Sequence, residues 1–494
     1  MNITTLFYET ARDFAKKAAL VENDEEVSYK ELADRIEKLS VAFREIGIKE
    51  NDKVALILPN SSEFMSCFLA LLKINAIVSP LSPEITPYEL KGIFNNLKPH
   101  AIISIPILID RVGYEYSTLL DNKICVVQGN ITAGNQTKKY FSLNELYGLR
   151  LDAYDIMGDR GMDGEQVATV NYTYRGTGHP LGAMLSHSNY IECTLAYLKN
   201  TRMSSQHRVL SFLPLSHVYP LVGCMLAPIL CGATVIISKN YLPRAILKII
   251  DDYQIDYLTA VPSIYLLLLR NNKRNIYDLS SLTCCLTGGA YMPQDVQEAV
   301  KNEMGVEVLQ GYGLTESLLI AINPFGNNKR CSLGLPFKDN FRFLIVGENG
   351  VCMKANEIGE IAVNSPTVMR GYYNQKKETD AVLKNGWLYT GDYGCLDDEG
   401  YLYFTGLKKK VANVGGNLVD LKEVQNILLS HPLVSDASVD VREDDLWGHV
   451  VEAKVVSKGN GELTENEIKS FCSAKISRYK IPKVIRFTKE VLQR

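Results

Sequence analysis

The chain has 494 residues, too many for one hydrophobic core, so two or more domains are expected. Apolar residues make up 46% and charged residues 22% of the chain, which is typical of a soluble globular protein. The net charge of −3 argues against a nucleic acid or an anionic membrane as partner. Eleven cysteines without a C-x-x-C pair favour reduced thiols over a disulfide framework or a zinc site. No signal peptide is predicted at the N-terminus, and a cytoplasmic location is expected.

The first 105 residues alternate between helical and strand-like patterns. Helices are predicted at 4–17, 29–46, 62–72 and 87–96, and strands at 54–58, 76–79 and 101–105. Ser28 and Glu31 have the spacing of a capping box at the start of the second helix. The alternation predicts a largely parallel sheet with helices on its faces.

The same alternation of strand-like and helical patterns returns between residues 208 and 303. Strands are predicted at 208–213, 234–237, 257–261 and 282–286, and helices at 243–253 and 293–303. Residues 218–238 carry no charge and are about as long as a bilayer span. Because prolines and glycines interrupt this stretch, it is predicted to be a buried helix followed by a buried strand, and no transmembrane segment is expected.

The pattern changes after residue 331. Strands at 341–346, 359–363 and 401–405 are separated by glycine and asparagine turns. Beyond Gly406, helices at 421–429 and 465–474 and strands at 437–441, 450–456 and 483–487 indicate a small α+β domain. We therefore expect a large domain over residues 1–405 and a small domain over 406–494, joined by a hinge at 406–410.

The sequence Q-G-Y-G-L-T-E-S at Gln310–Ser317 follows a predicted strand at 306–309. Its glycines allow a ligand to approach the backbone, and Tyr312 offers a flat face to a base. Thr315 offers a hydroxyl to a phosphate, and Glu316 offers a carboxylate to Mg²⁺. The alternative is an ordinary turn with a helix cap.

A second glycine-rich stretch, Y-T-Y-R-G-T-G-H-P-L-G at Tyr172–Gly182, is rich in backbone N–H groups and hydroxyls suited to phosphate oxygens. It matches neither the Walker loop nor G-x-G-x-x-G, so a structural turn stays open. Further motifs end at His217, Ala290 and Asp392. Four of the motifs follow predicted strands, where ligands bind in open α/β sheets.

In motif order and spacing the whole chain resembles the adenylate-forming superfamily, which includes acyl-CoA synthetases, firefly luciferase and the adenylation domains of nonribosomal peptide synthetases. The resemblance implies a large N-terminal α/β domain, built of two α/β sheets and a β-barrel-like lobe. It also implies a small, mobile α+β C-terminal domain that rotates between two half-reactions.

The resemblance also implies a role for individual residues around ATP. The residues expected on the phosphates are Thr173, Thr177 and Gly178, with Thr315 at the α-phosphate. The residues expected around adenine are Gly289, Ala290 and Tyr312. Asp392 would accept both ribose hydroxyls, and Glu316 would hold Mg²⁺.

The remaining implied roles concern the acyl group and the small domain. His217 would border the acyl carboxylate, Lys409 falls at the hinge, and Gly415 and Gly416 would line the pantetheine tunnel. Each role has a structural alternative: a turn former for Asp392, a core histidine for His217, and a solvated basic face for Lys409 with its two lysine neighbours.

The chain departs from the family pattern at several positions. Leu181 stands at the loop lysine, and Arg175 stands where a glycine is usual. Our hypothesis is that Arg175 supplies the missing positive charge. Leu407 replaces the arginine that opens the small domain, and Leu421 replaces a proline. The final run, K-E-V-L-Q-R, resembles the segment just before the family's Gly-Lys motif, so whether that lysine is truncated or naturally absent stays open.

These features predict an AMP-forming acid–thiol ligase. It would use ATP and Mg²⁺ to activate a fatty or aryl carboxylic acid and pass the acyl group to CoA, with Glu316, Thr315, His217 and Arg175 as catalytic residues. Two alternatives remain: a ligase that loads a phosphopantetheine carrier protein, and a degenerate nucleotide- or acyl-adenylate-binding protein. A homodimer stays open.

Overall fold

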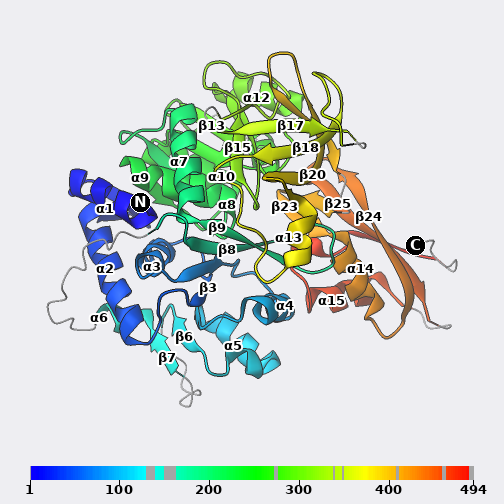
Figure 1. Ribbon diagram of the computed structural model, residues 1–494, viewed down its shortest axis with the longest axis horizontal. Helices are drawn as coiled ribbons and strands as arrows, with labels where there is room; N and C mark the ends of the chain where they lie inside the picture. The colour runs from blue at the N-terminus through cyan, green and yellow to red at the C-terminus, as the bar shows by residue number, and fades with distance from the viewer. Residues whose placement is uncertain are drawn as a thin grey trace.

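The computed structural model describes most of the chain. Figure 1 shows one large sheet with its helices (blue to cyan) below a second (green), and a small domain (orange to red) beside both. The described residues are 2–129, 139–148, 163–271, 276–337, 340–347, 350–407, 411–458 and 463–488.

The first large sheet has the strand order β7-β6-β5-β3-β4-β8-β9 and is parallel except for the β8–β9 pair. Its strands are β3 (Lys53–Ile57), β4 (Ile77–Pro80), β5 (Ala101–Ser104), β6 (Ile124–Val127), β7 (Lys139–Ser142), β8 (Val167–Thr173) and β9 (Leu181–Ser186). Its helices are α2 (Tyr29–Glu45), α3 (Ser62–Lys73), α4 (Pro87–Leu97), α5 (Pro106–Glu115) and α6 (Leu143–Gly148). The predicted parallel sheet is confirmed.

The second large sheet has the order β16-β15-β14-β13-β12-β10-β11-β1-β2. Its strands are β1 (Ala18–Glu22), β2 (Glu25–Ser28), β10 (Arg208–Ser211), β11 (Thr234–Ile237), β12 (Tyr257–Ala260), β13 (Cys284–Thr287), β14 (Val308–Leu314), β15 (Leu318–Ile322) and β16 (Leu335–Pro336). Helices α10 (Pro243–Tyr253), α11 (Pro262–Leu269) and α12 (Gln294–Met304) cover its outer face. The hairpin β1–β2 lies between two predicted helices, and the sequence analysis missed it.

One hydrophobic core joins the two large sheets. It includes side chains of α2 and α3 from the first sheet, and of α1 (Ile3–Asp13) and α7 (His187–Thr201) from the second. Helix α3 is apolar on nearly all sides because it lies in this middle layer. The uncharged stretch forms the short helices α8 (Val218–Pro220) and α9 (Ala227–Cys231), separated by a π-helical turn, and then β11, as predicted. In the part of the chain that the structure describes, no helix is long and apolar enough to span a membrane.

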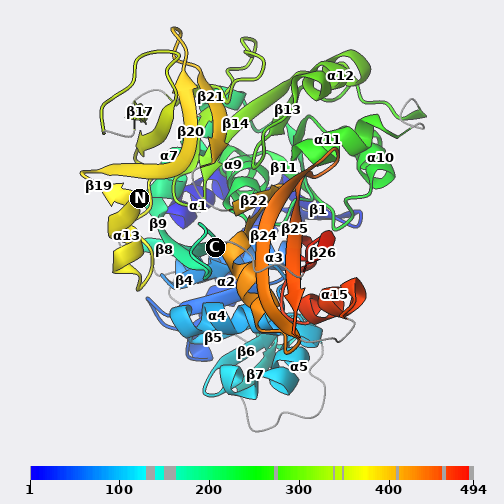
Figure 2. The same ribbon diagram turned by 90° about the vertical axis from the view of Figure 1, so that its right-hand side faces the viewer.

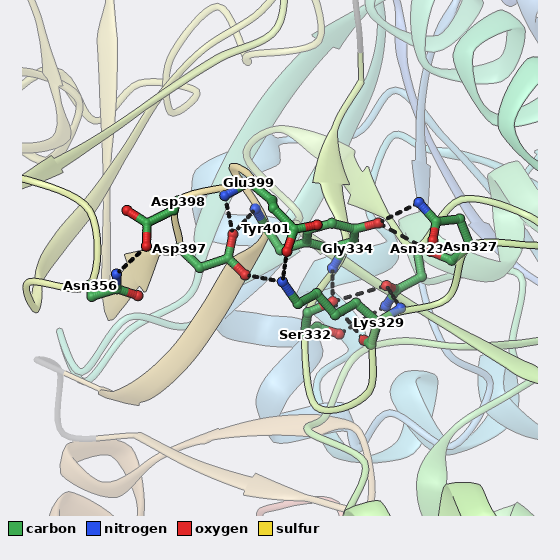
Figure 3. Close-up of polar contacts among 10 residues, drawn as sticks. All are labelled: Asn323, Asn327, Lys329, Ser332, Gly334, Asn356, Asp397, Asp398, Glu399 and Tyr401. Atoms are coloured by element: carbon green, nitrogen blue, oxygen red, sulfur yellow. Dashed lines mark hydrogen bonds and ion pairs between the residues drawn. The ribbon is translucent and has the colours of Figure 1, made fainter.

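A third, antiparallel sheet follows the second. Its strands are β17 (Arg342–Val346), β18 (Gly359–Asn364), β19 (Leu383–Lys384), β20 (Trp387–Leu396) and β21 (Leu402–Leu407), with α13 (Lys376–Val382) beside them. Lys329 fixes this sheet to the segment after β15. Figure 3 shows its ammonium group between Asp397 and Glu399, 2.7 Å from each, close to the turn that ends at Tyr401.

The small domain has its own sheet and its own core. Its strands are β22 (Val411–Val414), β23 (Asn417–Asp420), β24 (Val434–Asp444), β25 (Gly448–Ser457) and β26 (Val484–Phe487), and its helices are α14 (Leu421–Leu429) and α15 (Glu465–Ser473). Figure 2 shows this domain facing the viewer. The capping box predicted at Ser28 is present, and Thr464 forms a second one with Glu467 at the start of α15.

A buried ion cluster docks the small domain on the large one. The Lys480 ammonium lies 2.6 Å from Glu89 on α4 and 2.9 Å from Glu423 on α14. It also lies 4.1 Å from the ring centre of Tyr174, which belongs to the glycine-rich loop. Ser477 donates a hydrogen bond of 2.7 Å to Glu89. Because these groups are buried, each charge depends on its partners to replace lost water.

The pKa values of the two carboxylates of this cluster shift in opposite directions. Burial alone would raise the pKa of Glu89, but Lys480 and the hydrogen bonds from Ser477 and Thr86 hold it below its usual value. Burial raises the pKa of Glu423, and the nearby Glu89 charge raises it further. Glu89 is therefore the main negative partner of Lys480.

We expect Glu89→Gln to weaken docking by about 1.5–3 kcal/mol, the usual worth of a hydrogen bond to a charged group. Glu423→Gln is the matched control and should cost less, because its carboxylate carries charge less readily. Hydrogen–deuterium exchange of α4 and of the segment 475–481 measures the opening. A larger effect from Glu423→Gln would contradict this account of the cluster.

Candidate functional site

The carboxyl ends of three neighbouring parallel strands form the base of the site. Ala260 of β12 pairs with Thr287 of β13, and Thr287 pairs with Gln310 of β14. This register brings Val261, Gly288 and Gly311 to the same edge of the sheet. The predicted position at a strand end is therefore confirmed for the motif at 287–290, which follows β13.

The glycine-rich motif at 310–317 is a β-hairpin and not a turn that follows a strand. The predicted strand at 306–309 begins at Val308 and continues to Leu314, and the chain turns at Thr315–Ser317 into β15. A side chain at Gly313 would meet the Leu318 carbonyl oxygen at 2.2 Å, so the hairpin requires glycine there. Glu316 lies in this turn with a buried side chain, while Thr315 is half-buried.

Arg175 and Glu316 form a buried ion pair. Arg175 Nη1 lies 3.1 Å from Glu316 Oε1, and the two side chains are 9% and 3% exposed. The Tyr372 hydroxyl donates to the same Glu316 oxygen over 2.7 Å. Arg175 Nη2 donates to the carbonyl oxygens of Tyr389, at 3.1 Å, and of Thr390, at 2.6 Å. One guanidinium thus joins the glycine-rich loop, the hairpin turn and β20.

The pKa values of Arg175 and Tyr372 keep both groups protonated. Burial alone would lower the pKa of Arg175, but Glu316 and Tyr372 raise it on balance above its usual value. Burial raises the pKa of Tyr372, and the Glu316 charge raises it further. Tyr372 therefore remains a donor and Arg175 a cation across the physiological pH range.

Tyr312 and Asp392 meet across two sheets. The Tyr312 hydroxyl donates to Asp392 Oδ2 over 2.7 Å, and both residues are buried. Burial raises the pKa of Tyr312, and the Asp392 charge raises it further, so the phenol keeps its proton. The sequence analysis considered only the flat face of Tyr312, whereas its hydroxyl also orients the carboxylate predicted to bind ribose.

The loop between β8 and β9 contacts the small domain. Gly178 has a positive φ of 79°, and its backbone N–H donates to Asp420 Oδ2 over 2.8 Å. Asp420 also caps α14, because its Oδ1 accepts from the backbone N–H groups of Lys422 and Glu423. A carboxylate thus binds an N–H group predicted to hold a phosphate. The aspartate that precedes α14 is the sequence signal for the cap, but not for the loop contact.

The other two loop residues predicted to contact the phosphates, Thr173 and Thr177, differ in burial. Thr173 ends β8 and is buried. The Thr177 side chain is exposed, and its hydroxyl donates to the His179 carbonyl oxygen over 2.8 Å.

The turn between β22 and β23 rests on the end of β13. Asn413 donates to the Gly289 carbonyl oxygen and accepts from Gly416 N over 2.9 Å. A Cβ at Gly416 would lie 2.8 Å from Val261 Cγ1, and a Cβ at Gly415 would lie 2.6 Å from the Trp447 ring. The structure therefore brings the predicted tunnel glycines to the segment predicted to frame adenine, which continues to Ala290.

His217 begins α8, close to the same segment. Tyr219, on the next helical residues, packs beneath Gly288, where an added Cβ would lie 3.2 Å from the ring. His217 keeps accessible surface although protein surrounds it, and this partial loss of water lowers the pKa of its imidazole below the usual value. His217 is therefore a neutral group at neutral pH.

The departures from the family pattern have structural counterparts. Leu181 begins β9 and is buried in the core, so no charged side chain fits there. Leu407 pairs with Asp392 between β21 and β20. Leu421 begins α14 without a proline. The hinge prediction at Lys409, and the run at 489–494, lie outside the described residues.

The donor set does not fit a metal held by Glu316. Glu316 Oε1 already binds a guanidinium and a phenol. The Mg²⁺ role of Glu316 stays a prediction, and its surroundings do not support it.

Comparison with known proteins gives relatives that this chain matches over most of their length. The long-chain-fatty-acid–CoA ligase of Bacillus subtilis (strain 168) is 28% identical over 520 aligned residues, covering 99% of this chain and 91% of the relative. The 4-coumarate–CoA ligase 4 of Arabidopsis thaliana is 26% identical, covering 93% of this chain and 82% of the relative.

Two solved structures share the fold. The o-succinylbenzoate CoA synthetase of Bacillus subtilis, a double mutant bound to a product analogue, matches with a TM-score of 0.86 at 24% identity, covering 99% of this chain and 95% of that one. The amide bond synthetase McbA of Marinactinospora thermotolerans matches with a TM-score of 0.87 at 22% identity, covering 99% and 96%. Both confirm the predicted fold of a large N-terminal α/β domain with a smaller C-terminal domain.

The family models settle the classification. The AMP-binding enzyme model matches residues 7–373, and the model of the AMP-binding enzyme C-terminal domain matches residues 423–494. Together with the CoA ligase relatives, they confirm the resemblance predicted from the sequence motifs: the chain belongs to the AMP-binding enzyme family, within the adenylate-forming superfamily.

Proposed function

We propose that the protein is an AMP-forming acyl-CoA synthetase that activates a fatty or aryl carboxylic acid with ATP and passes the acyl group to the thiol of CoA. The contact of Gly416 with Val261 and Gly289 carries the proposal, because it places a narrow glycine turn of the small domain at the strand ends. A protein that only bound nucleotide would have no need for this fit.

In the first half-reaction an oxygen of the acid attacks the α-phosphorus of ATP. The bond to the bridging oxygen breaks, and pyrophosphate leaves. Asp392, held by Tyr312, would accept the ribose hydroxyls, and Thr315 would donate to the α-phosphate oxygens. His217, neutral at this pH, would border the carboxylate without attracting it away from the phosphorus.

In the second half-reaction the thiol attacks the acyl carbonyl, and AMP leaves with the electron pair. The docked small domain suits this step, because Asp420 already binds the Gly178 N–H group that a triphosphate would need. Gly415 and Gly416 have positive φ angles of 57° and 91° and let this turn, predicted to line the pantetheine tunnel, pack closely against Trp447 and Val261. The acceptor could equally be a carrier protein with the same arm.

The Arg175–Glu316 pair favours a second candidate function, a nucleotide-binding protein with weak catalysis. In such a protein the Arg175–Glu316 pair would stabilise the fold and would take no part in catalysis. The two candidates differ in whether bound ATP reacts.

Acid-dependent exchange of pyrophosphate into ATP tests the proposal across a panel of fatty and aryl acids. We expect exchange with at least one acid and its loss in Asp392→Asn. Binding of ATP without exchange for every acid would support the nucleotide-binding candidate.

Tyr312→Phe should weaken AMP binding about tenfold, because Asp392 would lose the donor that orients it. Isothermal titration measures the affinity, and thermal unfolding measures stability separately. Tyr393→Phe is the matched control, since neighbouring residues of a strand point to opposite faces. Equal affinities in the two variants would show that the hydroxyl has no such role.

Gly416→Ala should slow thioester formation from preformed acyl-adenylate about tenfold or more while changing pyrophosphate exchange less than about threefold. The added methyl would collide with Val261. Gly448→Ala is the control, because Gly448 has a positive φ of 73° but nothing within 4 Å of an added Cβ. A similar loss in both variants would assign the effect to backbone strain.

A further inference from the structure

The geometry points to Arg175 as the resident cation of the nucleotide site: its guanidinium takes the place beside Glu316 that a divalent metal would occupy, so ATP binds without a metal held by Glu316. This inference rests on the proposed ATP site and concerns how that site balances its charge.

The first step of the argument is the occupation of one oxygen of the Glu316 carboxylate. Glu316 Oε1 accepts from Arg175 and from Tyr372, at 3.1 Å and 2.7 Å. A buried carboxylate needs one counter-charge, and here the chain itself provides it. A metal at the same oxygen would displace both donors and would lie against a guanidinium of like charge.

The second step is the fixation of the guanidinium. Its other terminal nitrogen binds the Tyr389 and Thr390 carbonyl oxygens of β20. Two backbone carbonyls and a carboxylate accept from its two terminal nitrogens, which suits the forked donors of arginine. Arg175 cannot swing away without giving up its bonds to all three acceptors.

The third step is the position of the cation between the predicted ligand groups. Arg175 belongs to the loop expected at the phosphates, Glu316 follows Thr315, and Thr390 lies two residues before Asp392. The positive charge that the family places at residue 181 is absent, because residue 181 is a leucine here. The Leu181 side chain is buried in the core. Arg175 is the basic side chain that this chain places in the loop instead.

The experiment compares ATP binding with and without metal, in the absence of any acid so that no reaction follows. Isothermal titration of the full chain in EDTA and in excess Mg²⁺ should give affinities within about threefold of each other for the wild type. Arg175→Gly should lose about tenfold or more in EDTA. Mn²⁺ should restore its binding at Glu316, where it replaces the positive charge of Arg175.

Further variants separate the cation from its surroundings. Arg175→Gly combined with Glu316→Gln should not recover with Mn²⁺. His179→Gly, on the same loop but away from Glu316, should behave as the wild type. Arg175→Lys should recover part of the metal-free affinity, since it keeps the charge but not the planar fork. The Mn²⁺ paramagnetic resonance signal, recorded with protein in the absence of ATP, should change on binding to Arg175→Gly but not to the wild type.

Wild-type binding that rises more than about tenfold with Mg²⁺ and is lost in Glu316→Gln would overturn the inference, and so would a complete absence of ATP binding. The proposed function fails differently: the wild type would bind ATP in EDTA yet exchange no pyrophosphate with any acid.

Discussion

A buried ammonium group requires carboxylates around it, and Lys480 takes one from each domain. Glu89 belongs to the first large sheet's helices and Glu423 to the small domain, so the charge balance is complete only when the domains are docked. Tyr174 covers the same ammonium group and immediately precedes Arg175. The position of the small domain and the path of the glycine-rich loop therefore depend on one charge.

The site follows from this docking. With the small domain seated, Asn413 and Gly416 reach Gly289, and Asp420 reaches Gly178. The large domain alone supplies the Tyr312–Asp392 pair and the Arg175–Glu316 pair. The side-chain pairs predicted to contact the nucleotide thus belong to the large domain alone. The contacts at Gly289 and Gly178 exist only while the small domain is docked.

Local signals predicted much of this architecture. The periodic spacing of apolar residues predicted both end residues of α10, α14 and β11, because helix and strand periods are properties of short segments. The capping boxes at Ser28 and Thr464 were predictable because they need only four consecutive residues. The hairpin at 310–317 was predicted as a turn, because glycines in a strand give a turn-like pattern although here they permit close packing of β14 on β15.

Long-range pairs could not be predicted in the same way. Arg175 stood out as an unusual residue, but its partner lies 141 positions away, and only the meeting of β8, β14 and β20 brings them together. The 242-residue separation of Gly178 and Asp420 has the same cause. Asp420 also shows how a residue with an obvious local task can have a distant one, because a carboxylate has two oxygens and the cap uses one.

That second oxygen has a kinetic consequence. Under the proposed function, Asp420 and a phosphate oxygen compete for the same Gly178 N–H group, so loop-bound pyrophosphate and the seated small domain exclude each other. The small domain then docks only after pyrophosphate has left. A high pyrophosphate concentration would keep the small domain undocked by mass action. The order of the two half-reactions would then depend on the single hydrogen bond between Gly178 and Asp420. Asp420 can release this bond without unwinding the helix, because it caps the helix with its other oxygen.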